Sequence, residues 1–298
     1  MARTPAIGRS RRLALALLVA LAALLVFAGA AFADALTPES GGSPNADEID
    51  SLYKLILVVA VVIFVGVEGA LFYSLFKFRA RKGLVAAQIR GNTRLEVGWT
   101  VGAALILVVL AAITFVKLGD IRNPPNSGPE GLQLADGVLV AEGPAKRLPP
   151  NGKSLNICVN GQQYIWRYTY ANDCANAPLS SPFSYQEMVV PVDTTVTLDI
   201  NAQDVAHSWW IPKLGGKFDA VPGYTNHTWF KVPGKMAGTV FTGQCAELCG
   251  RNHANMTARV RAVTPAEYER WLDQRKADIK AADKAAQEER KKVEQTTP

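Results

Sequence analysis

Residues 243–256 read GQCAELCGRNHANM, which brings two thiols, an imidazole and a thioether together in the spacing C-x3-C-x3-H-x2-M. These side chains belong to Cys245, Cys249, His253 and Met256. A second imidazole, His207, lies upstream in the run DVAHSW. Only three histidines occur in the whole chain, so two of them in one constellation with thiols indicate a metal site.

The ligand types indicate copper. Thiolate, thioether and imidazole suit copper and exclude calcium or magnesium as the ion that they hold. Zinc is satisfied by two thiolates and two imidazoles and has little use for a thioether. A single blue-copper ion uses one cysteine, whereas this set has two, and two bridging thiolates raise the ligand count to that of two copper ions. Bridging would let the pair share one electron, which predicts an electron-transfer site with no open position for substrate.

Each cysteine and the third histidine also have a structural explanation. Cys245 and Cys249 could form a disulfide in an exported protein, but the added imidazoles and thioether favour a metal site. His227 has no ligand neighbours in its stretch, so we expect it on a strand or the surface. Cys158 and Cys174 flank one aromatic strand, which predicts a structural disulfide, with two unpaired thiols as the alternative.

The composition excludes a nucleic-acid binder and a disordered chain. The 298 residues are 49% hydrophobic and 19% charged, which is too apolar for disorder. The net charge of +6 arises from four arginines in the first twelve residues and six basic residues in the segment 77–96. Residues 119–263 carry twelve basic and eleven acidic side chains, which leaves no basic face for nucleic acid.

Three apolar segments predict export and membrane anchoring. The arginines before the apolar run 13–33, with AFA at its end, predict a signal peptide over residues 1–33, with an uncleaved anchor helix as the alternative. Residues 55–76, with Glu68 as their only charge, and residues 97–116, with none, each match a membrane-spanning helix. A buried globular hairpin is the alternative. Glu68 should face protein or water, because a charge is costly in lipid.

The charges around these segments predict the domain order. The basic segment 77–96 lies in the cytoplasm by the positive-inside rule. The hairpin then occupies residues 55–118, and the loop-like segment 34–54 and everything after residue 117 lie outside. Residues 119–152, rich in Pro, Gly and Asn, are expected to form a linker.

Short β-rich runs fill residues 153–264 and predict an antiparallel sandwich or barrel. The expected strands cover residues 155–159, 164–170, 188–200, 228–232, 239–242 and 257–263. After them, residues 266–272 have an amphipathic helical pattern. The charged remainder of the tail 265–298 is expected to be a solvated helix or disordered.

The order of signal, two membrane helices, β-domain, DVAHSW run and copper loop resembles subunit II of haem–copper cytochrome c oxidases. The resemblance implies an all-β cupredoxin-like Greek-key sandwich that holds the binuclear copper A centre, in a multi-pass protein of a bacterial plasma membrane. It implies side-chain copper ligands at His207, Cys245, Cys249, His253 and Met256, and a backbone carbonyl ligand at Glu247. The Glu247 carboxylate would also reach a magnesium ion shared with subunit I.

Three further residues match functional positions of that family. Glu96, in the run LEVGWT, resembles the glutamate at the mouth of a proton-uptake channel, with an ordinary interfacial carboxylate as the alternative. The run GQQYIWRY at 161–168 resembles the aromatic segment in which a tryptophan receives the donor's electron. Here Tyr164 takes the aligned position and Trp166 is the next tryptophan, so either could receive the electron. Asp204 matches an acidic residue of the donor's docking surface.

The resemblance implies that copper A accepts electrons from cytochrome c and passes them to haem in subunit I, where oxygen is reduced to water. Subunits I and III would be the partners, and haem would occur only in the partner, because this chain has no C-x-x-C-H motif. Relatives that oxidise quinol have lost the copper ligands, which this chain retains. Its near-neutral domain predicts a membrane-tethered or less basic cytochrome donor.

Two alternative functions are compatible with parts of the pattern. A copper A subunit of a nitric oxide reductase would carry the same loop. A membrane-anchored copper chaperone or thiol protein would also use C-x3-C and a distant histidine. In that class the cysteines come early and begin a helix, and the histidine follows them. Here His207 precedes Cys245 and Cys249, which argues against the chaperone.

Overall fold

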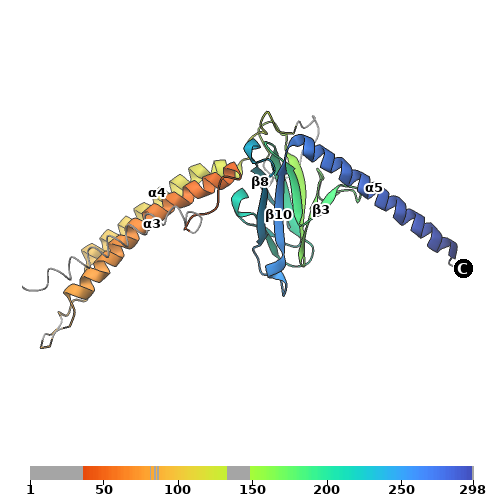
Figure 1. Ribbon diagram of the computed structural model, residues 1–298. Coiled ribbons are helices and arrows are strands. Elements are labelled where there is room, and N and C mark those ends of the chain that lie inside the picture. The colour runs from red at the N-terminus through yellow and green to blue at the C-terminus, as the bar shows by residue number, and fades with distance from the viewer. Residues whose placement is uncertain (1–35, 81, 84, 86, 133–147, 297–298) are drawn as a thin grey trace, which may run out of the picture. The chain divides into compact units, whose positions relative to one another are not determined.

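The computed structural model describes residues 36–296, apart from 81, 84, 86 and 133–147. The predicted signal peptide at 1–33 lies outside the described residues. Two long helices come first, α3 over Pro44–Lys77 and α4 over Thr93–Arg122, and they run side by side (Figure 1). Both are long and apolar enough to cross a membrane.

The helices extend beyond the predicted apolar runs. Residues 44–54 were expected to be loop-like, and this was wrong, because α3 already begins at Pro44. Proline at the first turn and Asp47 close behind it are favourable at a helix N-terminus. The start of α4 is capped by Asn92, whose side chain accepts from Leu95 N, while Glu96 Oε1 accepts from Asn92 N at 3.1 Å. Glu96 therefore lies in the first helical turn.

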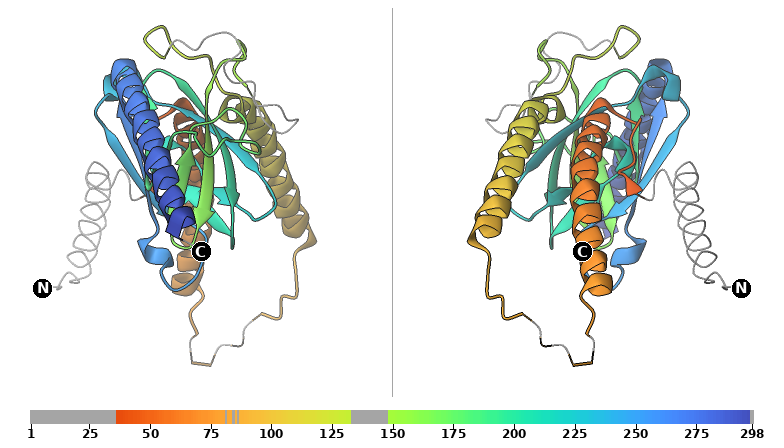
Figure 2. Two further views of the ribbon diagram at one scale, coloured as in Figure 1. Left: turned by 90° about the vertical axis from the view of Figure 1, so that its right-hand side faces the viewer. Right: turned by 90° about the vertical axis from the view of Figure 1, so that its left-hand side faces the viewer.

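In the part of the chain that the structure describes, ten strands form two five-stranded sheets, which Figure 2 shows as separate layers. The first sheet has the order β3-β2-β1-β5-β8, with β1 Leu155–Gln162, β2 Ile165–Thr169, β3 Phe183–Tyr185, β5 Thr195–Ala202 and β8 Asn226–Lys231. The second has the order β4-β10-β9-β6-β7, with β4 Glu187–Pro191, β6 His207–Trp210, β7 Phe218–Ala220, β9 Val240–Cys245 and β10 Thr257–Val263. The predicted sandwich is confirmed, with a core of buried apolar side chains between the layers.

Two details of the predicted sheets were wrong. The strand pairs β1–β5 and β4–β10 are parallel, whereas all pairs were expected to be antiparallel. The run 188–200, expected to be one strand, is divided between β4 in one sheet and β5 in the other. The chain crosses between the sheets at Asp193, whose φ of 53° is left-handed and whose N–H donates to Val232 O. Pro191 and Asp193 are turn-type residues at this crossing, which the prediction of one strand overlooked.

The predicted disulfide between Cys158 and Cys174 is confirmed. Cys158 lies on β1 between the fully buried Ile157 and Val159, so its side chain points to the outer face of the sheet. The bond joins residues sixteen positions apart. Asn156 Nδ2 donates to the backbone oxygens of Ala171 and Asn172, so the segment before Cys174 is held against this face.

The C-terminal tail is a continuous helix, α5 over Pro265–Thr296. Thr264 and Glu267 form a capping box, in which Thr264 Oγ1 accepts from Glu267 N and Glu267 Oε2 accepts from Thr264 N. Tyr268 is buried, and the ring centroids of Trp271 and Tyr170 are 4.9 Å apart. The later turns of α5 are helical and mostly exposed. The prediction of a solvated helix is therefore confirmed, and the alternative of a disordered tail is not.

The first part of the predicted linker is bound to the sandwich. Thr195 Oγ1 donates to Pro125 O at 2.6 Å, Gly128 N donates to Asp193 O at 2.8 Å, and Leu132 N donates to Thr194 Oγ1 at 2.7 Å. Residues 125–132 therefore act as a strap across the start of β5. A Cβ atom on Gly128 would collide with the Asp193 carboxylate and force it away from Glu130 N and Lys231 Nζ.

We expect Gly128→Ala to lower the free energy of unfolding by about 1–3 kcal/mol, the usual cost of forcing an atom into a packed site. Thermal unfolding of the full chain in detergent, followed by near-UV circular dichroism, measures the change. Gly216→Ala is the control, because no atom lies within 4 Å of the added Cβ. An unfolding temperature for Gly128→Ala equal to that of the control would show that the strap does not contribute.

Candidate metal centre

Strand pairing brings the predicted ligands together. His207 begins β6 and Cys245 ends β9, and these neighbouring antiparallel strands pair Trp209 with Cys245. The chain then returns through a loop that contains Cys249 and the short 3-10 helix η3, His253–Asn255. Cys245 N donates to Met256 O at 2.9 Å, and this bond closes the loop before β10.

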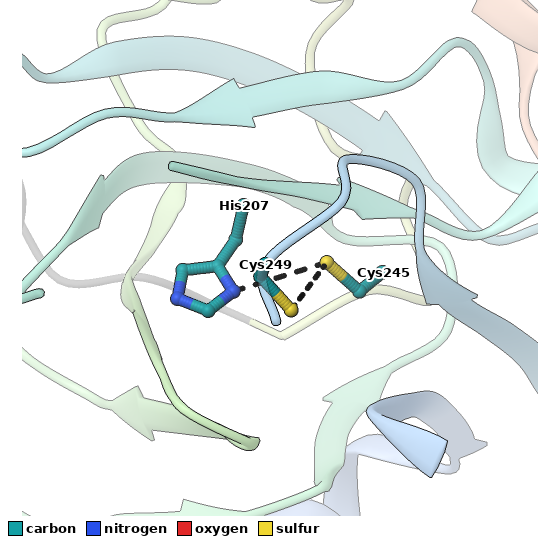
Figure 3. Close-up of side chains that lie close together, drawn as sticks. All are labelled: His207, Cys245 and Cys249. Atoms are coloured by element: carbon teal, nitrogen blue, oxygen red, sulfur yellow. Dashed lines mark hydrogen bonds between the residues drawn. The ribbon is translucent and has the colours of Figure 1, made fainter. Parts of the chain in front are cut away.

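The donor atoms of the five predicted side-chain ligands form one cluster. Cys245 Sγ lies 3.9 Å from His207 Nδ1 and 3.9 Å from Cys249 Sγ, and Figure 3 shows these three side chains pointing toward one another. Cys249 Sγ lies 3.5 Å from His253 Nδ1 and 3.9 Å from Met256 Sδ. Both cysteines are free thiols, so the alternative of a disulfide between them is not realised.

The cluster is buried and chemically suited to copper. His207 and Met256 are fully buried and both thiols nearly so, while His253 is partly exposed. Burial, assisted by the neighbouring Cys245, raises the pKa of the Cys249 thiol to about 11. A metal must therefore replace thiol protons when it binds. Cys245 Sγ also lies 3.2 Å from Glu247 O, so the sixth predicted ligand is at the same site, and the whole donor set fits copper.

Asp204 orients His207. Its Oδ1 lies 2.9 Å from His207 Nε2 and accepts from Val205 N at 2.7 Å, while Oδ2 accepts from Gln163 N at 2.7 Å. A carboxylate that receives Nε2–H leaves Nδ1 free to bind a metal. Burial alone would raise the pKa of the Asp204 carboxyl, but its hydrogen bonds, with His207 first, hold that pKa below its usual value. The resemblance matched Asp204 only to a docking acid, although its position three residues before His207 could have indicated this second role.

The turn between β1 and β2 lies against the cysteine loop. Gln163 Nε2 donates to Cys249 O at 2.6 Å. Gly250 has a left-handed φ of 126°, and a Cβ atom there would lie 2.6 Å from Tyr164 Oη. Sequence reasoning missed the contact between Gln163 and Cys249, because no local pattern joins residues 86 positions apart.

The two aromatic residues predicted as candidates for electron entry, Tyr164 and Trp166, differ in how deeply they are buried. Tyr164 is half-buried and reaches the cysteine loop at Gly250. Trp166 is fully buried, and its ring centroid lies 5.9 Å from that of His207. Gly161 makes room for the rings of Trp166 and His207. A Cβ atom at position 161 would lie 3.1 Å from the Trp166 ring and 3.0 Å from the His207 ring.

The remaining predicted residues lie outside the cluster. His227 is on β8, as expected of a strand histidine, and its Nδ1 lies 2.7 Å from Asp199 Oδ1. Glu96 is in the first turn of α4. Cys245 ends a strand and Cys249 lies in a loop, so neither begins a helix as the chaperone alternative requires.

Family comparisons agree with this architecture. The family model described as cytochrome C oxidase subunit II, periplasmic domain, matches residues 173–263, and the one described as its transmembrane domain matches residues 31–116. The cytochrome c oxidase subunit 2 of Alkalihalophilus pseudofirmus is 34% identical over 249 residues, covering 82% of this chain and 63% of that protein. The probable cytochrome c oxidase subunit 2 of Rickettsia bellii is 30% identical over 274 residues, covering 85% of this chain and 91% of that protein.

Among solved structures, the chain is similar to the periplasmic domain of subunit II of cytochrome oxidase of Bradyrhizobium japonicum. The sequence identity is 32% and the TM-score is 0.37. The match covers 43% of this chain and 97% of that one.

We expect Asp204→Ala to weaken copper binding about 10- to 100-fold, because His207 loses the group that fixes its ring. The copper affinity of Asp204→Asn should lie between those of the wild type and Asp204→Ala, since the amide oxygen can still accept one of the hydrogen bonds. Competition with a copper chelator measures the affinity. Gln203→Ala, at an exposed neighbouring position, is the control and should bind like the wild type. Equal affinities for Asp204→Ala and the control would contradict the orienting role.

Proposed function

This chain belongs to the cytochrome c oxidase subunit II family, and on that premise we propose that it is the electron-accepting subunit of a respiratory cytochrome c oxidase. The observation that carries the proposal is the convergence of two thiols, two imidazoles and a thioether in one buried cluster. The chain is anchored by its apolar helices and has an extracytoplasmic domain. We place it in a bacterial plasma membrane, crossed twice by α3 and α4.

The cluster would hold the two copper ions of copper A, which supply one-electron transfer when bound. The side chains of His207, Cys245, Cys249, His253 and Met256 and the Glu247 carbonyl are the proposed ligands. Burial of His207, Met256 and both thiols excludes water from most of the site. The hydrogen bond to Asp204 fixes the His207 ring. A rigid, dry ligand shell suits electron transfer, because little has to rearrange when the charge changes.

Tyr164 is the residue that we propose to receive the electron. It is half-buried and contacts the cysteine loop at Gly250, whereas Trp166 is fully buried and out of reach of a donor. The exposed rim of the site includes Val205 and Leu248, and the carboxylate of Asp204 is already hydrogen-bonded within the domain. This favours a donor that docks with little charge attraction, namely a membrane-tethered or less basic cytochrome c.

The remaining steps are assigned to partner subunits. Electrons would pass to haem in subunit I, where oxygen is reduced to water, and subunit III would complete the assembly. The Glu247 carboxylate is exposed, so it is available for a magnesium ion shared with subunit I. Glu96, in the first turn of α4 near the cytoplasmic loop, is the proposed entrance residue for protons.

We expect the full chain, purified in detergent and loaded with copper, to bind two copper ions and to give a mixed-valence EPR signal. Cys249→Ser should bind at most one and lose that signal, because a bridging thiolate is gone. His227→Ala is the matched control, since this histidine lies outside the cluster and should leave the copper count unchanged. Metal analysis and EPR make the measurement. One copper per wild-type chain with an ordinary type 2 signal would contradict the proposal.

We expect turnover of the complex with a soluble basic cytochrome c to change less than about threefold between roughly 50 and 200 mM salt, because the exposed Glu247 and Arg251 on either side of Leu248 have opposite charges and leave little net charge to screen. Leu248→Glu adds an acid at an exposed rim position and should steepen the salt dependence. Steady-state oxygen consumption is the measurement. A steep fall for the wild type would show that docking depends on charge and would contradict the predicted donor class.

A further inference from the structure

The cysteine loop, which runs from Cys245 to Met256, is fixed at its two ends. Cys245 N donates to Met256 O and Ala246 N donates to Ser208 O, each at 2.9 Å. In the middle of the loop Cys249 is buried, although residues 247, 248 and 250–252 around it are exposed. Exposed side chains gain little from packing, so the loop's own side chains do little to keep Cys249 in place.

One hydrogen bond joins the middle of the loop to the rest of the domain. Gln163 Nε2 donates to Cys249 O at 2.6 Å. Among the residues that the structure describes, residues 247–252 make no other hydrogen bond to a residue outside the loop. Their remaining bonds are local, such as the one from His253 N to Gly250 O at 3.1 Å. The position of Cys249 therefore depends on the Gln163 side chain.

Gln163 is itself held by its backbone. The pairing of Gln162 with Ile165 leaves Gln163 and Tyr164 as a two-residue turn between β1 and β2, and such short turns have few conformations. The N–H of Gln163 donates to Asp204 Oδ2 at 2.7 Å. Any residue but proline keeps that bond, so the bond from the Gln163 side chain can be removed alone.

We propose that Gln163 is a positioning residue that holds the cysteine loop closed and keeps Cys249 in the metal cluster. With the bond in place, Cys249 Sγ lies 3.9 Å from Cys245 Sγ and 3.5 Å from His253 Nδ1. Gln163 is exposed, so water competes for this bond and the loop opens more readily than the sandwich unfolds. A bound metal would leave through the same opening. The inference rests on the proposed function only in taking that metal to be copper.

The first test measures opening of the loop without any metal. Gln163→Met keeps the length of the side chain and removes its donor. In the metal-free full chain in detergent, with both thiols free, iodoacetamide should alkylate Cys249 about five- to tenfold faster in this variant than in the wild type. That factor is the size expected when one hydrogen bond is lost. Mass spectrometry of the peptide that contains Cys249 follows the reaction.

Two controls separate opening of the loop from other effects. Gln162→Met makes the same replacement one residue earlier, where the side chain donates to Asn160 Oδ1 and not to the loop. Gly128→Ala weakens the strap on β5 and so destabilises the whole sandwich. Both should alkylate Cys249 within about twofold of the wild-type rate, because neither touches the bond from Gln163 to Cys249.

The second test measures release of the metal. The copper-loaded full chain is mixed with an excess of chelator, and the rate of copper loss should rise about five- to tenfold in Gln163→Met and stay within about twofold of the wild type in Gln162→Met. The loss of the copper absorption bands follows the release.

Each other result overturns the inference. An alkylation rate in Gln163→Met equal to that of the wild type would show that the bond does not hold the loop. A rise as large in Gly128→Ala would show that Cys249 reacts through opening of the whole sandwich. A copper release rate unchanged in Gln163→Met would show that the bond does not act on the loaded site. A wild-type chain that binds no copper contradicts the proposed function, whereas the alkylation rates still decide the role of Gln163.

Discussion

The backbone hydrogen bond from Cys245 N to Met256 O is the constraint on which the candidate metal centre depends. It fixes both ends of the cysteine loop at the point where β9 leaves the sheet and β10 begins. Because β9 also pairs with β6, the first thiol of the loop lies beside the imidazole of His207. The loop then only has to place Cys249 and His253 close to Cys245 and His207. Ordinary sheet pairing therefore assembles a ligand set that comes from two distant parts of the chain.

The local part of this arrangement could be predicted from the sequence, and the long-range part only in outline. The spacing of Cys245, Cys249, His253 and Met256 lies within one loop, so residue types alone indicated a copper site. The approach of His207 depends on the pairing of β6 with β9, and β6 has only four residues, too few for a recognisable pattern. The bond between Asp204 and Gln163, 41 residues apart, could not be predicted for a related reason, whereas the contact of Asp204 with His207 lies within one short run.

The sandwich was predicted as a class of fold, but its connections were not. Pro191 and Asp193 are turn-type residues that mark the crossing from one sheet to the other, but the strand prediction followed the apolar and β-branched residues on both sides of them. The same crossing brings β1 beside β5 and β4 beside β10 as parallel pairs. The supposed linker was misjudged because its glycines and prolines indicate a loop without showing that its backbone bonds to β5. In the membrane hairpin, hydropathy identified both helices, but it did not predict that α3 begins at Pro44 or that α4 continues to Arg122.

Gly250 bears on the rate of the electron transfer proposed for this protein. Electron tunnelling slows steeply as the gap between donor and acceptor widens, and a gap through space is worse than a path through packed atoms. Because position 250 lacks a side chain, the ring of Tyr164 rests directly on the backbone that follows Cys249. Any larger residue would wedge the aromatic turn away from the loop. In the proposed electron route, the smallest amino acid in the loop would thus set the distance between Tyr164 and the cysteine cluster.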